Sequence, residues 1–192
     1  MEITAEKIMQ QLSAGTQVAG VIAVFGEEGY YKDKIAAALP RAVFGDAALE
    51  DREITVFERD TDIKEVSAAV NTYPFFSGRS LVIIKDEKLW GGKDGGEKRK
   101  QQQEELAELL ADVPEHCQVL LLGEKIDKRG KLYKSLLKTA AMVECKSLKS
   151  YQLKPWLDEQ AALRGCCFDY EASQTIMEYL SLIHISEPTR QA

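Results

Sequence analysis

The chain has 192 residues, of which 45% are hydrophobic and 29% charged, a composition typical of a globular protein with one full core and room for a small second unit. No apolar run approaches the ~18 residues that cross a bilayer, and the acidic N-terminus lacks a signal peptide's apolar core, so we expect a cytoplasmic protein with no membrane partner. The net charge of −6 argues against a general nucleic-acid coat protein.

Short continuous apolar runs recur along the chain as far as residue 145. Runs of this kind are typical of strands that are buried on both faces of a parallel sheet. The predicted strands are 18–25, 53–57, 81–85, 118–122 and 142–145.

Helical patterns separate these strands. Thr4 is expected to cap the first helix, and Pro40 is expected to end the second. The glycine-, lysine- and glutamine-rich stretch 91–103 is predicted to be a mobile loop that leads into a helix. The predicted helices are 5–12, 30–39, 63–71, 104–110 and 129–138. A residue within 60–62 is expected to cap the third of them.

The order of these elements predicts an α/β fold, a parallel five-stranded sheet covered by helices on both faces. We expect this domain to span 1–147. Helices without strands then predict the start of a small helical domain over 148–180. The ending 181–192 lacks helical periodicity and contains Pro188, so we expect a C-terminally truncated chain with a non-native tail.

The first predicted strand leads into a glycine-containing turn at the place where nucleotide-binding α/β proteins carry the phosphate loop G-x-x-x-x-G-K-S/T. Gly26 and Lys32 fit that pattern, but Tyr31 replaces the second glycine and Asp33 replaces the magnesium-binding hydroxyl. A tyrosine obstructs the nest of backbone N–H groups around a phosphate, and the neighbouring acids repel the anion. We therefore expect a strand–helix turn that binds no ATP, and we expect the protein to use no cofactor.

An ATP-hydrolysing P-loop enzyme is the alternative. Its chemistry would use Lys32 on the phosphates, with Asp86 and Glu87 after the strand 81–85 orienting magnesium and water. Strands that end in acids are common, so this signal is weak.

Phe75 and Phe76 stand together in a connection bounded by Pro74 and by the turn at Gly78 and Arg79. The pair fits neither helical nor strand periodicity, and binding residues concentrate on such connections. We expect at least one ring to be an exposed anchor for a partner's hydrophobic pocket. The alternative is that both rings belong to the core.

Basic residues cluster between 125 and 138, against one acid. The cluster is a candidate patch facing DNA, and a solvated helix face is the alternative. The patch comprises Lys125, Lys128, Arg129, Lys131, Lys134 and Lys138.

The four cysteines form no CxxC pair, and the chain has only two histidines. Cysteines of this kind are typical of reduced, small hydrophobic residues rather than of metal ligands or nucleophiles. We therefore expect no metal site and no catalytic residues.

Several blocks in order resemble the delta subunit of the bacterial DNA polymerase III clamp loader. They cover most of residues 18–180 and together are fairly specific, although each alone is weak. The blocks are VIAVFGEEGYYKDKI, NTYPFFSGRSLVIIKD, VLLLGEKIDKRGKLYKSLLK, VECKSLKSYQLKPWLDEQAALRG and the start of YEASQTIMEYL.

The resemblance implies an AAA+-like, P-loop-type domain that hydrolyses no ATP itself. It also implies that the chain acts in DNA replication, as a subunit of a DNA polymerase, which is a nucleotidyltransferase complex. It implies binding to the β sliding clamp through a hydrophobic pair, which by position is Phe75 and Phe76, with Pro74, Gly78 and Arg79 shaping the turn. The implied partners are the clamp, the gamma/tau and delta prime subunits for a full-length protein, and primer-template DNA. Within the helical lid domain of the family, the resemblance covers only the beginning, over 148–180.

Overall fold

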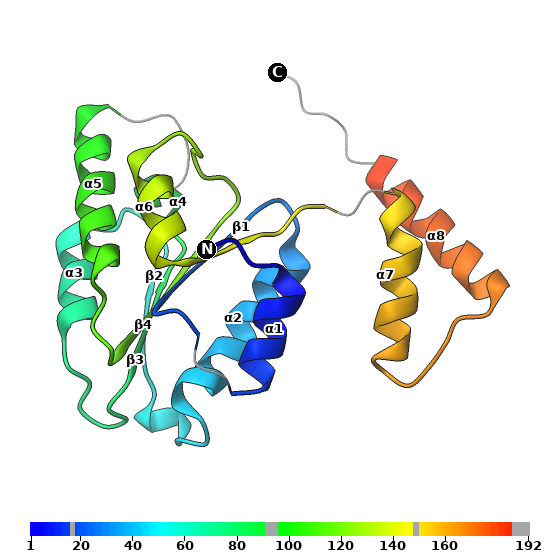
Figure 1. Ribbon diagram of the computed structural model, residues 1–192, viewed down its shortest axis with the longest axis horizontal. Coiled ribbons are helices and arrows are strands. Elements are labelled where there is room, and N and C mark those ends of the chain that lie inside the picture. The colour runs from blue at the N-terminus through cyan, green and yellow to red at the C-terminus, as the bar shows by residue number, and fades with distance from the viewer. Residues whose placement is uncertain (16–17, 91–95, 148–149, 186–192) are drawn as a thin grey trace. The chain divides into compact units, whose positions relative to one another are not determined.

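A computed structural model describes residues 1–15, 18–90, 96–147 and 150–185 (Figure 1). The chain divides into two compact units, Met1–Lys146 and Ser147–Ala192. The first unit contains a parallel sheet with helices on both faces, and the second contains two helices. Along the described residues, no helix combines the length and apolarity that a membrane crossing requires.

All five strands of the sheet run parallel, in the order β2-β3-β4-β1-β5. β1 therefore lies inside the sheet, and its backbone pairs with β4 on one side and β5 on the other. The strands are β1 (Val21–Phe25), β2 (Glu53–Phe57), β3 (Ser80–Ile84), β4 (Cys117–Gly123) and β5 (Ala141–Glu144). The predicted parallel α/β sheet is confirmed.

Helices cover the two faces of the sheet unequally (Figure 1). The helices α1 and α2 lie on one face, and α3, α4, α5 and α6 lie on the other. Their bounds are α1 Ala5–Ser13, α2 Gly29–Phe44, α3 Ile63–Asn71, α4 Glu87–Trp90, α5 Glu97–Ala111 and α6 Lys131–Thr139.

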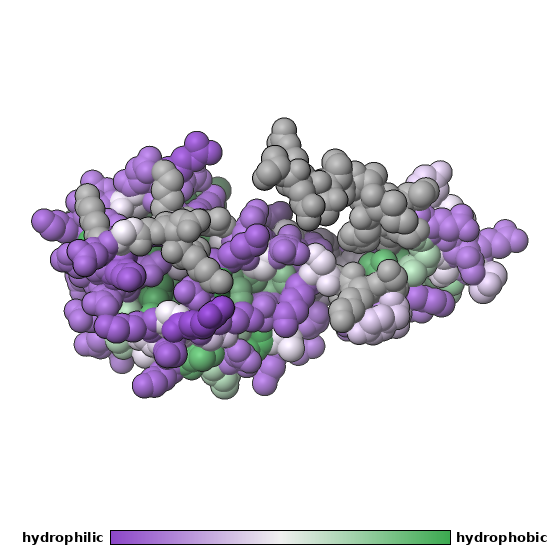
Figure 2. Space-filling model, turned by 90° about the horizontal axis from the view of Figure 1, so that it is seen from above, coloured by the Kyte–Doolittle hydropathy of each residue, from purple (hydrophilic) through white to green (hydrophobic). Residues whose placement is uncertain are grey.

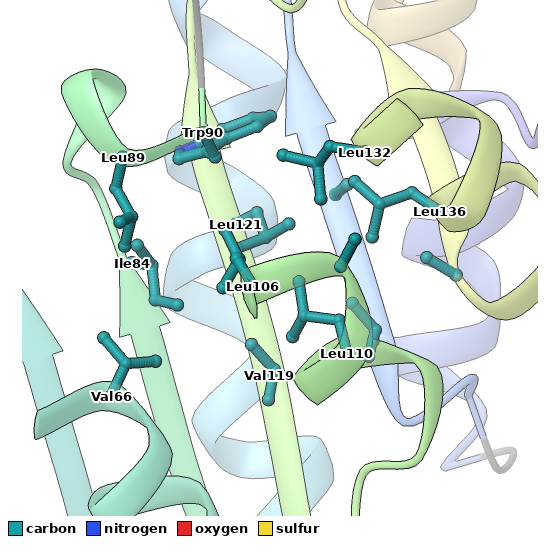
Figure 3. Packing of buried hydrophobic residues seen from close by; sticks show 14 of the residues in the cluster. Val66, Ile84, Leu89, Trp90, Leu106, Leu110, Val119, Leu121, Leu132 and Leu136 are labelled. Carbon is teal, nitrogen blue, oxygen red and sulfur yellow. The ribbon is translucent and has the colours of Figure 1, made fainter. Parts of the chain in front are cut away.

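The core has two halves because successive residues of a strand point to opposite faces. In β1, Val21, Ala23 and Phe25 pack toward α3–α6, while Ile22 and Val24 pack toward α1 and α2. Figure 3 shows the first half, where Leu106 of α5 lies against Leu121 of β4 and Leu132 and Leu136 of α6 lie beside each other. Every residue of β1 is buried, which is why its sequence is uniformly apolar.

Two helix starts agree with the caps expected from sequence. The Thr4 hydroxyl accepts a hydrogen bond from the backbone N–H of Lys7 at 3.3 Å, and the Asp62 carboxylate accepts one from Lys64 at 3.0 Å. Each cap satisfies an N–H group that has no partner within its helix.

The predicted end of α2 at Leu39 is wrong. The helix continues through Pro40 to Phe44. Pro40 lacks a backbone N–H, but Val43 and Phe44 are buried against the sheet, and that burial favours a continued helix over the local preference of proline.

The predicted loop 91–103 is also wrong in part. α5 begins at Glu97, because the lysines, glutamines and glutamates that follow are good helix formers. Residues 91–95 lie outside the described residues. The short helix α4 was not predicted, and β1 begins at Val21 rather than at residue 18.

The second unit contains α7 (Ser150–Ala162) and α8 (Tyr170–Ile185). The Asp169 carboxylate accepts a hydrogen bond from the N–H of Ala172 at 2.7 Å and caps α8. The expectation of a helix ending near 180 is wrong, since 181–185 are helical; 186–192 lie outside the described residues. The division into domains 1–147 and 148–180 with a non-native tail stays a prediction.

Candidate interaction site at the edge where the strands begin

The connection 72–79 links the end of α3 to the start of β3. α3 ends where the Thr72 N–H and hydroxyl both donate to the carbonyl of Ala68, at 2.9 and 2.7 Å. The Ser80 N–H donates to the carbonyl of His116 at 2.8 Å, at the point where β4 also begins. The connection therefore lies at the edge of the sheet where the parallel strands begin, at the bottom of the first unit in Figure 1.

Phe75 and Phe76 are both exposed, with 87% and 67% of their surface open to solvent. Their rings contact each other edge to face, with centroids 5.0 Å apart and planes at 78°. Pro74, the residue before them, is buried and anchors the chain. The alternative that both rings belong to the core is wrong, and the expectation of an exposed ring is confirmed.

The backbone of this pair is held by a residue that the sequence did not indicate. One oxygen of the Glu53 carboxylate, Oε1, accepts hydrogen bonds from the N–H groups of Phe75 at 2.5 Å and Phe76 at 3.0 Å. Glu53 is the first residue of β2, and β2 pairs with β3 so that Glu53 lies opposite Ser80. The only sequence signal was an acid at the start of a predicted strand, which is too common to assign a role.

The turn after the pair uses Gly78, which adopts a left-handed φ of 65°. The Ser77 hydroxyl donates to the carbonyl of Arg79 at 2.6 Å across this turn. Arg79 thus supports the turn through its backbone, while its exposed side chain lines a hollow of about 520 Å³ next to His116. Tyr73 is also exposed, and the centroid of its ring lies 5.1 Å from that of the His116 imidazole.

The degenerate phosphate loop lies at the opposite edge of the sheet, where β1 ends. Gly26 has a φ of 131°, and a Cβ atom there would lie 2.0 Å from the carbonyl oxygen of Cys145. The Lys32 ammonium donates to the carbonyl of Gly26 at 2.7 Å. The Glu28 carboxylate accepts from the N–H of Tyr30 at 2.9 Å and so caps α2.

These contacts oppose a nucleotide at this turn. In a phosphate loop, the free N–H groups at the helix N-terminus and the lysine meet the anion. Here a carboxylate of the chain's own Glu28 occupies the helix N-terminus, and Lys32 is engaged by the loop's own carbonyl. Asp33 is exposed and adds negative charge, and Tyr31 packs edge to face on Tyr30.

Asp86 does not sit free at the end of β3. It is buried, with 3% of its surface exposed, and its Oδ2 accepts from the N–H of Thr61 at 2.9 Å. The contact ties the end of β3 to the connection that follows β2. The side chain of Glu87 lies outside the described residues.

The basic cluster around α6 is partly neutralised. Lys128 pairs with Glu144 at 2.7 Å, and Lys131 pairs with Glu104 of α5 at 2.7 Å. The hydrogen bond that the Lys128 ammonium donates to the Glu144 carboxylate raises the pKa of Lys128. Lys125, Arg129, Lys134 and Lys138 are exposed. Lys128 and Lys131 are exposed as well, and a role of the cluster in DNA contact stays a prediction.

Hydrophilic residues cover most of the surface of the first unit in Figure 2, which looks down on the molecule from the top of Figure 1. Among the described parts of the chain, no three histidine, cysteine or acidic side chains gather closely enough to hold a metal ion.

The four cysteines divide into two classes with different expected reactivity. Cys117 and Cys145 are buried and Cys166 and Cys167 exposed; burial raises the pKa of Cys145 to about 11. We expect a thiol reagent at pH 8 to modify Cys166 and Cys167 quickly, and the buried pair only after unfolding. Rapid labelling of a chain in which Cys166 and Cys167 are serine would contradict this.

The same pKa shift sets a pH dependence. The unfolded chain releases the Cys145 proton at lower pH than the folded chain does, so the titration of Cys145 costs no folding stability below about pH 9 and lowers it as the pH rises toward about 11.

The sequence profile described as "DNA polymerase III, delta subunit" matches residues 24–146, more than half of the chain. The chain belongs to this family. The DNA polymerase III subunit delta of Bacillus subtilis (strain 168) is 29% identical to this delta-family chain over 137 residues, which are 70% of the chain and 39% of the relative. The family resemblance drawn from the sequence is confirmed.

A solved structure shares the fold. The Bacillus subtilis DNA clamp loader delta protein matches with a TM-score of 0.72 and 24% identity, over 89% of this chain and 51% of that one. A DNA polymerase III gamma subunit-related protein of Thermotoga maritima matches with a TM-score of 0.48 and 16% identity, over 91% and 57%. The first of these shares the parallel α/β fold of this chain. The delta-family chain spans about two fifths of its curated relative and half of the solved one.

Proposed function

We propose that this delta-family chain binds the β sliding clamp as part of a clamp loader and helps to open it during DNA replication. Phe75 and Phe76 are the contact, and the chain itself hydrolyses no ATP. The observation that carries the proposal is the exposure of both rings on a connection that the backbone holds in place.

Two adjacent phenyl rings in water are unfavourable for a protein that acts alone. Transferring them into an apolar pocket of a partner removes that surface from water, and such aromatic anchors dominate the energy of many interfaces. Because the connection leads directly into β3, the pocket of the clamp would engage a feature that is continuous with the rigid sheet. Binding the open ring more tightly than the closed ring is the only way such contacts can favour opening.

The other partners follow from family membership. Assembly with gamma/tau and delta prime subunits, and contact with primer-template DNA, are proposed for a full-length family member in the cytoplasm. The described residues support the clamp contact more directly than these, since the rings lie within the region that the family profile matches.

Titration of the 192-residue chain against the purified β sliding clamp of the same organism, followed by calorimetry, tests the proposal. We expect saturable binding at micromolar or lower concentrations. Heats that stay at the dilution baseline throughout the titration would contradict the proposed clamp contact.

Binding of radiolabelled ATP in the presence of magnesium tests the ATP-hydrolysing alternative. We expect no retention of label by the wild-type chain, because the Glu28 carboxylate occupies the N-terminus of α2 and Lys32 already donates to the carbonyl of Gly26. Lys32→Ala is the matched variant. Magnesium-dependent binding by the wild type that disappears in Lys32→Ala would restore the alternative.

A further inference from the structure

The connection that carries the two phenylalanines has little packing of its own. Both rings are exposed, and Ser77 to Arg79 lie at or near the surface. What orders the backbone here is the buried Pro74 on one side, the turn at Gly78 on the other, and the hydrogen bonds to Glu53 between them.

The Glu53 contact is a strong form of hydrogen bond. The N–H groups of two successive residues converge on a single carboxylate oxygen, an arrangement in which backbone donors form a small anion-binding concavity. Because the acceptor is ionised, each bond is stronger than one between neutral groups. The carboxylate belongs to the first residue of β2, so the exposed pair is tied to the sheet itself.

We propose that Glu53 is a positioning residue that holds Phe75 and Phe76 in the orientation in which the clamp receives them. This role rests on the proposed clamp contact. Glu53 does not touch the partner; it removes conformational freedom from the pair before binding. A partner that meets an ordered pair loses less entropy on association than one that must order a free loop.

The test compares three variants of the full chain. Glu53→Ala removes the acceptor. Glu53→Gln keeps an acceptor oxygen on a side chain of the same length but removes its charge. Glu50→Ala is the control, because it removes an equal charge from an exposed residue close by in sequence. Each variant is titrated against the clamp. Amide hydrogen exchange at Phe75 and Phe76 is measured by NMR in the free chain, where the clamp plays no part.

For Glu53→Ala we expect clamp affinity to weaken by about threefold to tenfold, which matches the ordering of one or two side chains. Exchange at the Phe75 and Phe76 amides should become at least about tenfold faster, as expected when a protecting hydrogen bond is lost. Glu53→Gln should recover part of both effects, and Glu50→Ala should match the wild type.

The outcomes separate this role from the function on which it rests. A wild-type chain that does not bind the clamp overturns both. A wild-type chain that binds, with Glu53→Ala binding equally or more tightly, overturns the role of Glu53 alone. Unchanged amide exchange in Glu53→Ala also overturns it, because the two hydrogen bonds would then not order the pair.

Discussion

Replacing Phe75 and Phe76 together by alanine is expected to weaken clamp binding at least tenfold, or about 1.4 kcal/mol. Both rings are exposed in the free chain, so their removal opens no cavity in either half of the core. The loss therefore falls on the complex rather than on folding. Calorimetric titration gives the affinity, and the unfolding temperature should stay at the wild-type value.

The matched control removes two other exposed aromatic residues. Tyr151 and Tyr170 are exposed residues of the second unit, and their joint replacement by alanine takes away a similar apolar area. We expect this control to bind the clamp as the wild type does. Equal affinities for the wild type and for the Phe75→Ala, Phe76→Ala chain would remove the basis of the proposed contact.

Replacing Gly26 by alanine is expected to destabilise the first unit by about 3 kcal/mol or more, the range of severe backbone strain and steric overlap. The added methyl group would lie 2.0 Å from the carbonyl oxygen of Cys145, which is backbone and cannot swing away. The φ of 131° at Gly26 is itself disfavoured for alanine. That carbonyl also accepts from the N–H of Glu28, so a shift would disturb the start of α2.

Urea unfolding of the first unit measures this effect. A Trp156→Phe background leaves Trp90, which is buried in the first unit, as the fluorescent reporter. Gly29→Ala is the matched control, because no atom lies within 4 Å of its added methyl group and alanine is a better helix former than glycine. If Gly26→Ala and Gly29→Ala unfold at the same urea concentration, the backbone at this turn can accommodate the added methyl group, and the prediction is wrong.

Much of the fold follows from local patterns. β1 and β3 were predictable because a strand buried on both faces needs an unbroken apolar run, and those runs stand apart from the helical patterns around them. The caps at Thr4 and Asp62 were predictable because each acts on residues two or three positions away. The unfit phosphate loop was also visible, since Tyr31 and Asp33 break a motif of contiguous residues.

Other features depend on contacts between distant parts of the chain. α2 continues through Pro40 because Val43 and Phe44 are buried against the sheet. The free energy of that burial depends on tertiary contacts and is not part of any local helix propensity. Asp86, proposed by the alternative as a magnesium ligand, instead binds the backbone of Thr61 across neighbouring strands. Two of the six basic residues in the cluster, Lys128 and Lys131, are likewise paired with Glu144 of β5 and with Glu104 of α5.

The candidate site shows the same division. The amino-acid sequence alone determined that two adjacent phenylalanines lie on a connection outside any regular periodicity, because proline and glycine on either side exclude a continuous helix or strand. Only the tertiary structure decided that both rings face solvent and that Glu53 holds their backbone. The physical reason is that sheet pairing sets β2 beside β3, and this brings together residues that are 22 positions apart in the chain.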